Sequence, residues 1–227
     1  TARWAYAPCC CIGCRCCASG GLRFGLNTFL HLPGREELHL RGFDEETGLT
    51  LRLILKGDGL EITERRQLAE TGMLRSAALM QDDVETIAAA TDLLAETKLT
   101  PELRNEALYF RAKAYLNQRA DKKAMNDLQT LAKDTRTLYG AEAKYLVAQQ
   151  LYKAGEYTAA EKEILNFIDQ STPHAYWLAR SFVLLSDVYV AMDKKLDARQ
   201  YLLSLQQNYH ADDDIEQMIN ERLEKLK

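Results

Sequence analysis

The residue types best suited to chemistry in this sequence are six cysteines close to its beginning: Cys9, Cys10, Cys11, Cys14, Cys16 and Cys17. Two residues separate Cys11 from Cys14 and Cys14 from Cys17, a spacing that zinc-binding thiolates use, and His31 or His39 could supply a fourth ligand. Zinc sites usually join two separated pairs, however, and this cluster favours no single set of ligands. A disulfide framework spreads its cysteines between elements, so the cluster does not indicate one. A metal–thiolate site at Cys11, Cys14 and Cys17 is therefore one hypothesis.

Two other interpretations of the cluster stay open. Ile12-Gly13-Cys14 is similar to a lipoprotein cleavage site, which would make Cys14 an attachment point for acyl chains, although the apolar stretch of such a signal is missing. The simplest interpretation is an irregular leader, because cysteine, glycine and proline are scattered through residues 1–34 without any helical period. We expect residues 1–60 to form a leader of this kind, and the chain as given not to begin at the native N-terminus.

The end of the leader favours one short piece of regular structure. Residues 49–55 alternate in polarity as a strand does, and residues 37–41 could pair with them across a turn-rich link. An isolated two-stranded hairpin is only marginally stable in water. The leader is therefore predicted to be irregular, with at most a short β-hairpin that packs on the rest of the chain.

Other motifs that support catalysis are missing. Lys56-Gly57-Asp58-Gly59 lacks the spacing of a phosphate-binding loop, and the sequence has neither an H-E-x-x-H motif nor two paired C-x-x-C motifs. His174 and His210 lie at expected helix ends, where a surface or capping role explains them. The sequence predicts a protein that is not an enzyme and uses no cofactor.

Charge and hydropathy exclude two classes of partner. The net charge is −4 over 227 residues; residues 1–60 carry seven basic and six acidic side chains (+1), and residues 61–227 carry 22 and 27 (−5). A mildly acidic balance of this kind argues against nucleic acid as the main partner. No run approaches the roughly 18 apolar residues that span a bilayer. We expect a protein or peptide partner, no nucleic acid and no transmembrane segment.

The sequence between Glu106 and Tyr209 repeats one helical pattern, and the helices that it predicts must position any binding site. Small or apolar side chains recur at i, i+4 and i+7, which places each set on one face of a helix. The six sets are Leu108, Ala112 and Tyr115; Ala124, Leu128 and Leu131; Lys144, Ala148 and Leu151; Ala160, Ile164 and Phe167; Phe182, Ser186 and Tyr189; and Ala198, Leu202 and Leu205. Ala124, Ala160 and Ala198 lie 36 and then 38 residues apart, and this period with two amphipathic helices per unit indicates a solenoid of stacked hairpins.

Local signals favour the same register. Thr100-Pro101 and Thr172-Pro173 each place a hydroxyl at an N-cap and a proline at the first helical position. Short turns, which force antiparallel neighbours, are predicted at residues 119–121, 155–157 and 193–195.

A degenerate fourth copy is predicted ahead of the clear ones, at residues 63–99. Its first helix would bury Leu68, Met73, Ala77 and Met80, and its second would bury Ile87 together with Thr91 and Leu94. Terminal repeats of solenoids are commonly atypical, because one of their faces has no neighbouring repeat.

Together these residues resemble the tetratricopeptide repeat, most closely in the middle copy from Ala148 to Phe167. The resemblance covers about residues 100–209, and 63–99 less well, and it implies an all-α, right-handed superhelix of αα-hairpins. Two charged residues, Arg111 and Lys144, stand where the family has apolar ones, and the periods exceed the family's usual length of about 34. The residues whose close packing the resemblance implies are Ala112, Ala124, Ala148, Ala160, Ser186 and Ala198.

The resemblance also implies a binding surface, because the first helices of such hairpins line a concave groove. Aromatic residues flanked by long polar side chains suit recognition of a peptide. The Lys/Asn/Arg clamp with which one sub-family holds C-terminal carboxylates is not matched, since leucine stands at two of its positions, 146 and 184. The groove residues implied are Tyr109, Lys113, Asn117, Tyr145, Gln149, Lys153, Arg180, Val183 and Asp187.

Residues 213–227 are predicted to form one more amphipathic helix. Its apolar stripe comprises Ile215, Met218, Ile219, Leu223 and Leu226, with polar residues on the opposite face. Such a helix covers the exposed face of the last repeat. The alternative is that the stripe receives a helix from a partner.

The sequence as a whole predicts a non-catalytic scaffold that binds protein or peptide in the groove. Aromatic residues near the ends of the second helices, Phe167 and Tyr209, resemble those of envelope-assembly lipoproteins of Gram-negative bacteria. This finer resemblance implies a larger bacterial assembly, in the cytoplasm or associated with the envelope. Two alternatives are metal–thiolate or thiol chemistry through Cys9–Cys17, and a structural fragment of a longer repeat protein of the cell envelope.

Overall fold

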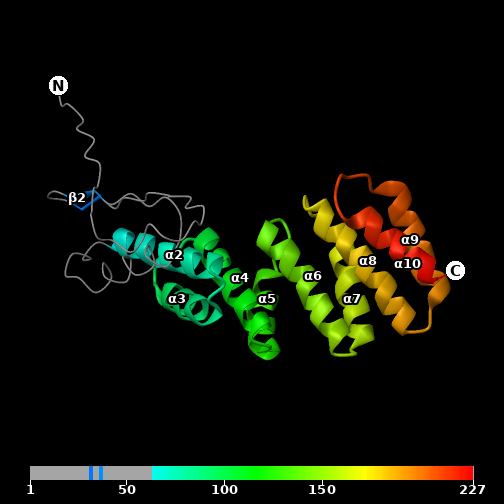
Figure 1. Cartoon of the computed structure of the whole chain (residues 1–227), viewed down its shortest axis with the longest axis horizontal. Coiled ribbons are helices and arrows are strands. Elements are labelled where there is room, and N and C mark those ends of the chain that lie inside the picture. The colour runs from blue at the N-terminus through cyan, green and yellow to red at the C-terminus, as the bar shows by residue number, and fades with distance from the viewer. Residues whose placement is uncertain (1–30, 33–35, 38–62, 227) are drawn as a thin grey trace, which may run out of the picture. The chain divides into compact units, whose positions relative to one another are not determined.

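The computed structural model describes residues 31–32, 36–37 and 63–226 (Figure 1). The chain comprises two units, Thr1–Gly42 and Phe43–Lys227. The second unit contains the predicted repeats.

A minimal strand pair is described in the first unit. Strand β1 (His31–Leu32) pairs antiparallel with β2 (Glu36–Glu37), so that His31 lies opposite Glu37 and Leu32 opposite Glu36. Apart from Glu37, the strands predicted at 37–41 and 49–55 lie outside the described residues. The cysteine cluster lies outside them as well.

The described part of the second unit is a row of helical hairpins closed by a final helix. The helices are α2 (Thr63–Leu79), α3 (Asp83–Ala95), α4 (Pro101–Asn117), α5 (Asp121–Leu131), α6 (Leu138–Lys153), α7 (Tyr157–Ile168), α8 (Ala175–Ala191), α9 (Lys195–Asn208) and α10 (Ile215–Lys225). From α2 to α9 each helix packs on the next, and α2, α4, α6 and α8 also contact one another in succession (Figure 1). This is the predicted all-α solenoid of αα-hairpins.

The first helices of the four hairpins end in the same way. Gln81, Arg119, Gly155 and Asp193 have positive φ angles of 58°, 58°, 79° and 60°. The residue that follows each of them donates its backbone N–H to the carbonyl five residues earlier, at 2.8–3.0 Å, which is the Schellman termination. These turn residues lie 38, 36 and 38 positions apart. The three predicted turns are confirmed, and a fourth of the same type opens the array.

The turn residues fix the register of the buried positions. Five residues after each turn, Thr86, Ala124, Ala160 and Ala198 are at most 3% exposed. Seven residues before each turn stand Leu74, Ala112, Ala148 and Ser186, which are at most 1% exposed. The small side chains among them allow the two helices of a hairpin to approach closely, and larger residues fill the space beside them. All six residues expected at the repeat packing positions are thus buried.

The two charged residues that depart from the repeat pattern are paired within their own hairpins. Arg111 of α4 forms a bidentate ion pair with Asp127 of α5, with both N–O distances 2.8 Å. Lys144 of α6, only 6% exposed, lies 2.8 Å from a carboxylate oxygen of Glu163 in α7. Both carboxylates stand three residues after the repeat alanine, where the last hairpin has Tyr201. Ion pairs therefore join the helices where the family pattern has apolar contacts.

The residues predicted to be buried in the first hairpin were wrong in part. Leu68 and Met80 are 53% and 40% exposed, whereas Leu74 is fully buried. On α3 the residue equivalent to the repeat alanines is Thr86, which is 3% exposed, and not the neighbouring Ile87. A shift of one residue turns a helical position by about 100°, so aligning the copy on Ile87 moved the expected stripe off the buried face.

One of the two predicted N-caps is present. The Thr100 hydroxyl accepts the backbone N–H of Leu103 at 3.3 Å, which confirms the cap of α4. Thr172 is not a cap, because α8 begins three residues later and its N-cap, His174, makes no side-chain cap bond. The Thr172 hydroxyl instead donates to the carbonyl of Thr135 at 2.8 Å and links two loops of adjacent hairpins.

The last helix packs on the chain itself. Ile215 and Ile219 are buried in a cluster with residues of α8 and α9. Asp213 accepts the backbone N–H of Ile215 at 3.0 Å, and no side-chain bond caps the helix at Asp214. Helix α10 therefore covers the last hairpin, and the buried part of its stripe is not free for a partner helix.

Candidate functional site

The surface where α4, α6 and α8 adjoin carries three of the nine predicted groove residues, Tyr109, Tyr145 and Arg180. We call it the inner face and define it by Tyr109, Tyr139, Glu142, Tyr145, Tyr176, Trp177 and Arg180. Between α4 and α6, the Tyr109 ring stacks on Tyr139 with centroids 4.6 Å apart. The Tyr109 hydroxyl and the Lys113 ammonium donate to the same oxygen of Glu142, at 3.0 and 3.3 Å. Burial, together with the charge of Glu142, raises the pKa of Tyr109 above its usual value, so Tyr109 stays a hydrogen-bond donor.

Between α6 and α8 the inner face is built around Arg180. Its guanidinium lies 5.3, 5.6 and 5.7 Å from the ring centroids of Tyr145, Tyr176 and Trp177, within the range of cation–π attraction. It also donates to the Tyr176 hydroxyl at 2.7 Å and lies 3.8 Å from a carboxylate oxygen of Asp214. Contacts from three rings hold the Arg180 side chain in place. Its first role is therefore to pack α6 against α8, and it is less available to a ligand.

A hollow of about 980 Å³ opens at one end of α4, α5 and α6. Four of the predicted groove residues line it, and the structure thus brings Lys113, Asn117, Gln149 and Lys153 together. We call this site the interhelix hollow. Its apolar lining is Leu116, Met125, Leu146, Leu151 and Ala154.

Five amide side chains belong to the polar lining of the interhelix hollow: Asn117, Asn126, Gln129, Gln149 and Gln150. Asn117 is already bonded to Asp83 at 2.9 Å, and Gln149 to the Tyr145 hydroxyl at 3.0 Å. Within the described part of the chain, the side chains of Asn126, Gln129 and Gln150 have no hydrogen-bond partner. Each amide offers both a donor and an acceptor, as does a peptide backbone unit.

The interhelix hollow is positively charged. Lys113, Arg119, Lys122 and Lys153 outnumber its two acidic residues, Asp121 and Glu156. Lys113 is paired with Glu142 at 3.3 Å. The other three cations form no ion pair with any described residue. Unpaired cations at the rim of a hollow attract carboxylates and raise their rate of association.

Three predicted groove residues lie elsewhere or are covered. Val183 is 1% exposed in the cluster with α9 and α10, so it offers no binding surface. Asp187 is paired with Arg222 of α10. Tyr145 is 6% exposed, beneath Arg180. The family register placed these residues on the right helices, but the extra helix and the aromatic contacts cover their side chains.

Second-helix residues are the part of the site that the sequence did not predict. Lys122, Met125, Asn126 and Gln129 of α5 line one wall of the interhelix hollow. They recur at i, i+3, i+4 and i+7, which marks one helical face. That spacing is visible in the sequence, but the family register assigns ligand binding to first helices alone.

No metal site or membrane span is found in the part of the chain that the structure describes. There, no three His, Cys, Asp or Glu side chains are grouped so that they could hold a metal ion. None of the described helices is both long and apolar enough to cross a membrane. The metal–thiolate hypothesis for Cys11, Cys14 and Cys17 lies outside the described residues and stays a prediction.

Comparison with solved structures identifies the fold. A Podosopora anserina protein described as a kinesin light chain with nearly identical TPR-like repeats superposes with a TM-score of 0.56 and 14% sequence identity, covering 72% of this chain and 83% of that one. No protein-family model and no curated protein matches the sequence. The chain therefore has the TPR-like fold that the resemblance implied, with stacked helical hairpins and a final covering helix.

Proposed function

We propose that this chain is a non-catalytic scaffold that binds an extended, acidic peptide segment of a partner protein. The interhelix hollow carries the proposal, since it combines an apolar floor, unpartnered amides and unpaired cations. The TPR-like fold supports a protein-binding role, because stacked hairpins present extended surfaces to partners. Assembly into a larger bacterial complex is the finer form of this proposal, and it is supported by the sequence resemblance to envelope-assembly lipoproteins.

Each part of the hollow has a task in this proposal. Asn126, Gln129 and Gln150 bond the exposed N–H and C=O groups of an extended backbone. Met125, whose side chain adapts to irregular shapes, packs with the leucines against an apolar side chain of the peptide. Lys122 and Lys153 pair with acidic side chains of the peptide and set its direction.

A selection experiment tests the proposal. A phage-displayed library of random peptides is selected on the full chain, and an enriched peptide is synthesised and titrated by fluorescence anisotropy. We expect enrichment of acidic residues beside one or two apolar ones. Reversing two charges in Lys122→Glu/Lys153→Glu should weaken binding at least about tenfold, because each lost pair is replaced by repulsion.

A matched variant separates this site from the overall charge. Lys162→Glu/Lys195→Glu changes the net charge equally, at exposed positions of α7 and α9 outside the hollow. It should bind the selected peptide as the unaltered chain does. If both double variants bind alike, or if Asn126→Ala/Gln129→Ala has no effect, the hollow is not the binding site.

A further inference from the structure

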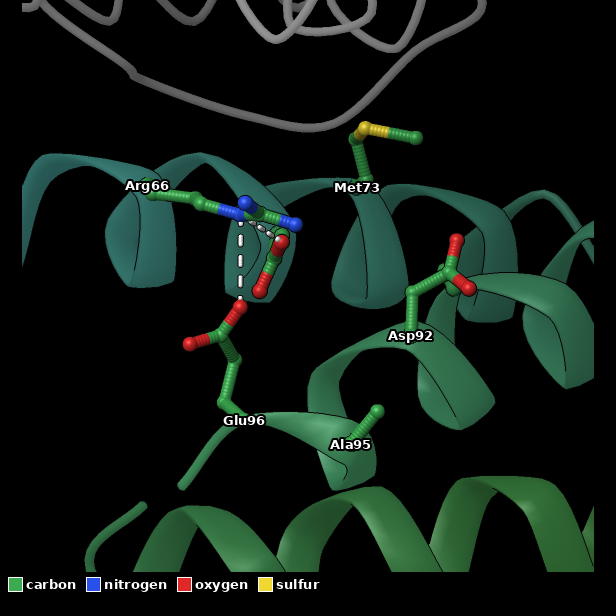
Figure 2. Close-up of a pocket in the computed structure, with 7 residues that line it drawn as sticks. Arg66, Met73, Asp92, Ala95 and Glu96 are labelled. Carbon is green, nitrogen blue, oxygen red and sulfur yellow. Dashed lines mark hydrogen bonds and ion pairs between the residues drawn. The ribbon is translucent and has the colours of Figure 1, made fainter. Parts of the chain in front are cut away.

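The first hairpin contains a second, oppositely charged pocket of about 560 Å³. Arg66, Glu70 and Met73 line it from one face of α2, and Ala89 and Asp92 from α3, with Ala95 and Glu96 at the end of that helix. Arg66 and Glu96 point toward each other across the space between the two elements, 3.2 Å apart (Figure 2). On α2 the face that contacts α4 is a different one, since Arg75 pairs with Glu106.

The charge of this pocket is not balanced by its own residues. Three carboxylates, from Glu70, Asp92 and Glu96, face a single guanidinium, that of Arg66, which leaves a net charge of −2. The Arg66 side chain is 56% exposed and bonds one oxygen of Glu70 at 2.8 Å. An arginine that is exposed to this extent screens a carboxylate weakly.

Glu70 supplies a second observation that points to a ligand. The residue is only 5% exposed, and its oxygen Oε2 is buried without a hydrogen-bond partner among the residues that the structure describes. Burial, with the neighbouring charges of Glu96 and Asp92, raises the pKa of Glu70 despite its bond to Arg66. A buried carboxylate oxygen without a donor costs free energy, and a bound cationic donor would remove that cost.

We propose that this pocket binds the ammonium group of a lysine side chain that a peptide presents. The ammonium is a compact charge whose three donors rotate freely, whereas the donors of a guanidinium are fixed in one plane, so an ammonium adapts more easily to carboxylates from two helices. Met73, Ala89 and Ala95 supply apolar walls for the aliphatic stem of the lysine. The inference uses residues of α2 and α3 only and does not depend on the interhelix hollow.

Three tripeptides test the proposal on the full chain. The probe is acetyl-Gly-Lys-Gly-amide, and methyl NMR follows Met73, Ala89 and Ala95. The same peptide with Nε-acetyl-lysine keeps the length and removes the charge, and an arginine peptide keeps the charge and changes the donor shape. We expect saturable shifts with the lysine peptide, weaker ones with arginine and none with acetyl-lysine.

The variants Glu70→Gln and Glu224→Gln complete the test. Glu70→Gln keeps the size of the side chain and should weaken lysine binding at least about tenfold. Glu224→Gln removes one negative charge from an exposed site on α10 and should change nothing. The proposal is overturned by an absence of saturable shifts, by equal shifts with acetyl-lysine, by tighter binding of arginine, or by full binding to Glu70→Gln. Those results would leave the interhelix hollow untouched, because its peptide and its variants are different.

Discussion

Arg222 of α10 forms a bidentate ion pair with Asp187 of α8, in which both N–O distances are 2.8 Å. The side chains are 25% and 27% exposed, so water screens the pair only in part. Arg222 falls within the apolar stripe of α10 by spacing, yet its guanidinium reaches across to the preceding hairpin. The pair therefore holds the covering helix on the array together with the buried side chains of Ile215 and Ile219.

A double-mutant cycle on this pair should show coupling. Arg222→Ala and Asp187→Ala should each lower the free energy of unfolding, and the coupling energy should be about 1 kcal/mol, since the pair is bidentate and partly buried. Urea denaturation measures all four forms. Arg222→Lys should recover less than half of the coupling, because an ammonium cannot bond both oxygens in parallel. Strictly additive single variants would show that the pair does not hold α10.

The Arg111–Asp127 pair should behave differently, because it is more deeply buried. Asp127→Ala leaves the mostly buried guanidinium without its carboxylate and should cost about 3 kcal/mol. The double variant Arg111→Met/Asp127→Leu removes both charges and should cost much less than the single one. Urea denaturation at two salt concentrations measures these differences. A double variant as unstable as the sum of its parts would contradict this account.

The features that the sequence predicted correctly are those that depend on the pattern of a single helix. Ala124, Ala160 and Ala198 are fully buried, because a small side chain at a helix crossing is specified by its own period. It did not predict that Thr86 takes this position in the first hairpin, since a threonine at one position and an isoleucine beside it fit two registers equally. The turn at Gln81 resolves the ambiguity, but only its backbone geometry identifies it.

Side-chain partners between hairpins were the part that could not be predicted. Asp187 faces the groove by family register, and nothing local to α8 indicates that Arg222, 35 residues later, will occupy it. The same holds for Thr172, whose hydroxyl bonds a loop of the preceding hairpin. Such contacts depend on how the array is stacked, which the period of a single helix does not contain.

Glycine substitutions at the Schellman turns should change the stability of the protein by different amounts. In the left-handed region a side chain costs about 1 kcal/mol relative to glycine, and aspartate tolerates it better than arginine does. Arg119→Gly should therefore stabilise the protein by up to about 1 kcal/mol, and Asp193→Gly by less. Gly155→Ala should destabilise it, through backbone strain alone, because no atom lies within 4 Å of the added methyl. Thermal unfolding of the three variants gives the order, and a stabilised Gly155→Ala would be inconsistent with the positive φ.

We expect the tyrosine at the end of α9, Tyr209, to make the folded state less stable at high pH. The Tyr209 hydroxyl donates to a carboxylate oxygen of Asp213 at 2.6 Å, and burial, followed by this bond, raises the pKa of Tyr209 from 10.0 to about 12. Because the folded state holds the proton more tightly, the unfolded chain ionises first as the pH rises. The stabilising contribution is therefore complete below about pH 10 and declines until about pH 12, where the folded state ionises too.

Tyr209→Phe isolates this contribution from the other tyrosines. Tyr109 and Tyr189 also have raised pKa values and impose the same sign of pH dependence on every form of the protein. The difference in unfolding free energy between the unaltered chain and Tyr209→Phe should thus be constant from neutral pH to about pH 9 and shrink above about pH 10. Urea denaturation at a series of pH values measures this difference. If it stays the same throughout, Tyr209 does not hold its proton through Asp213, and the link between α9 and α10 owes its order to the apolar contacts alone.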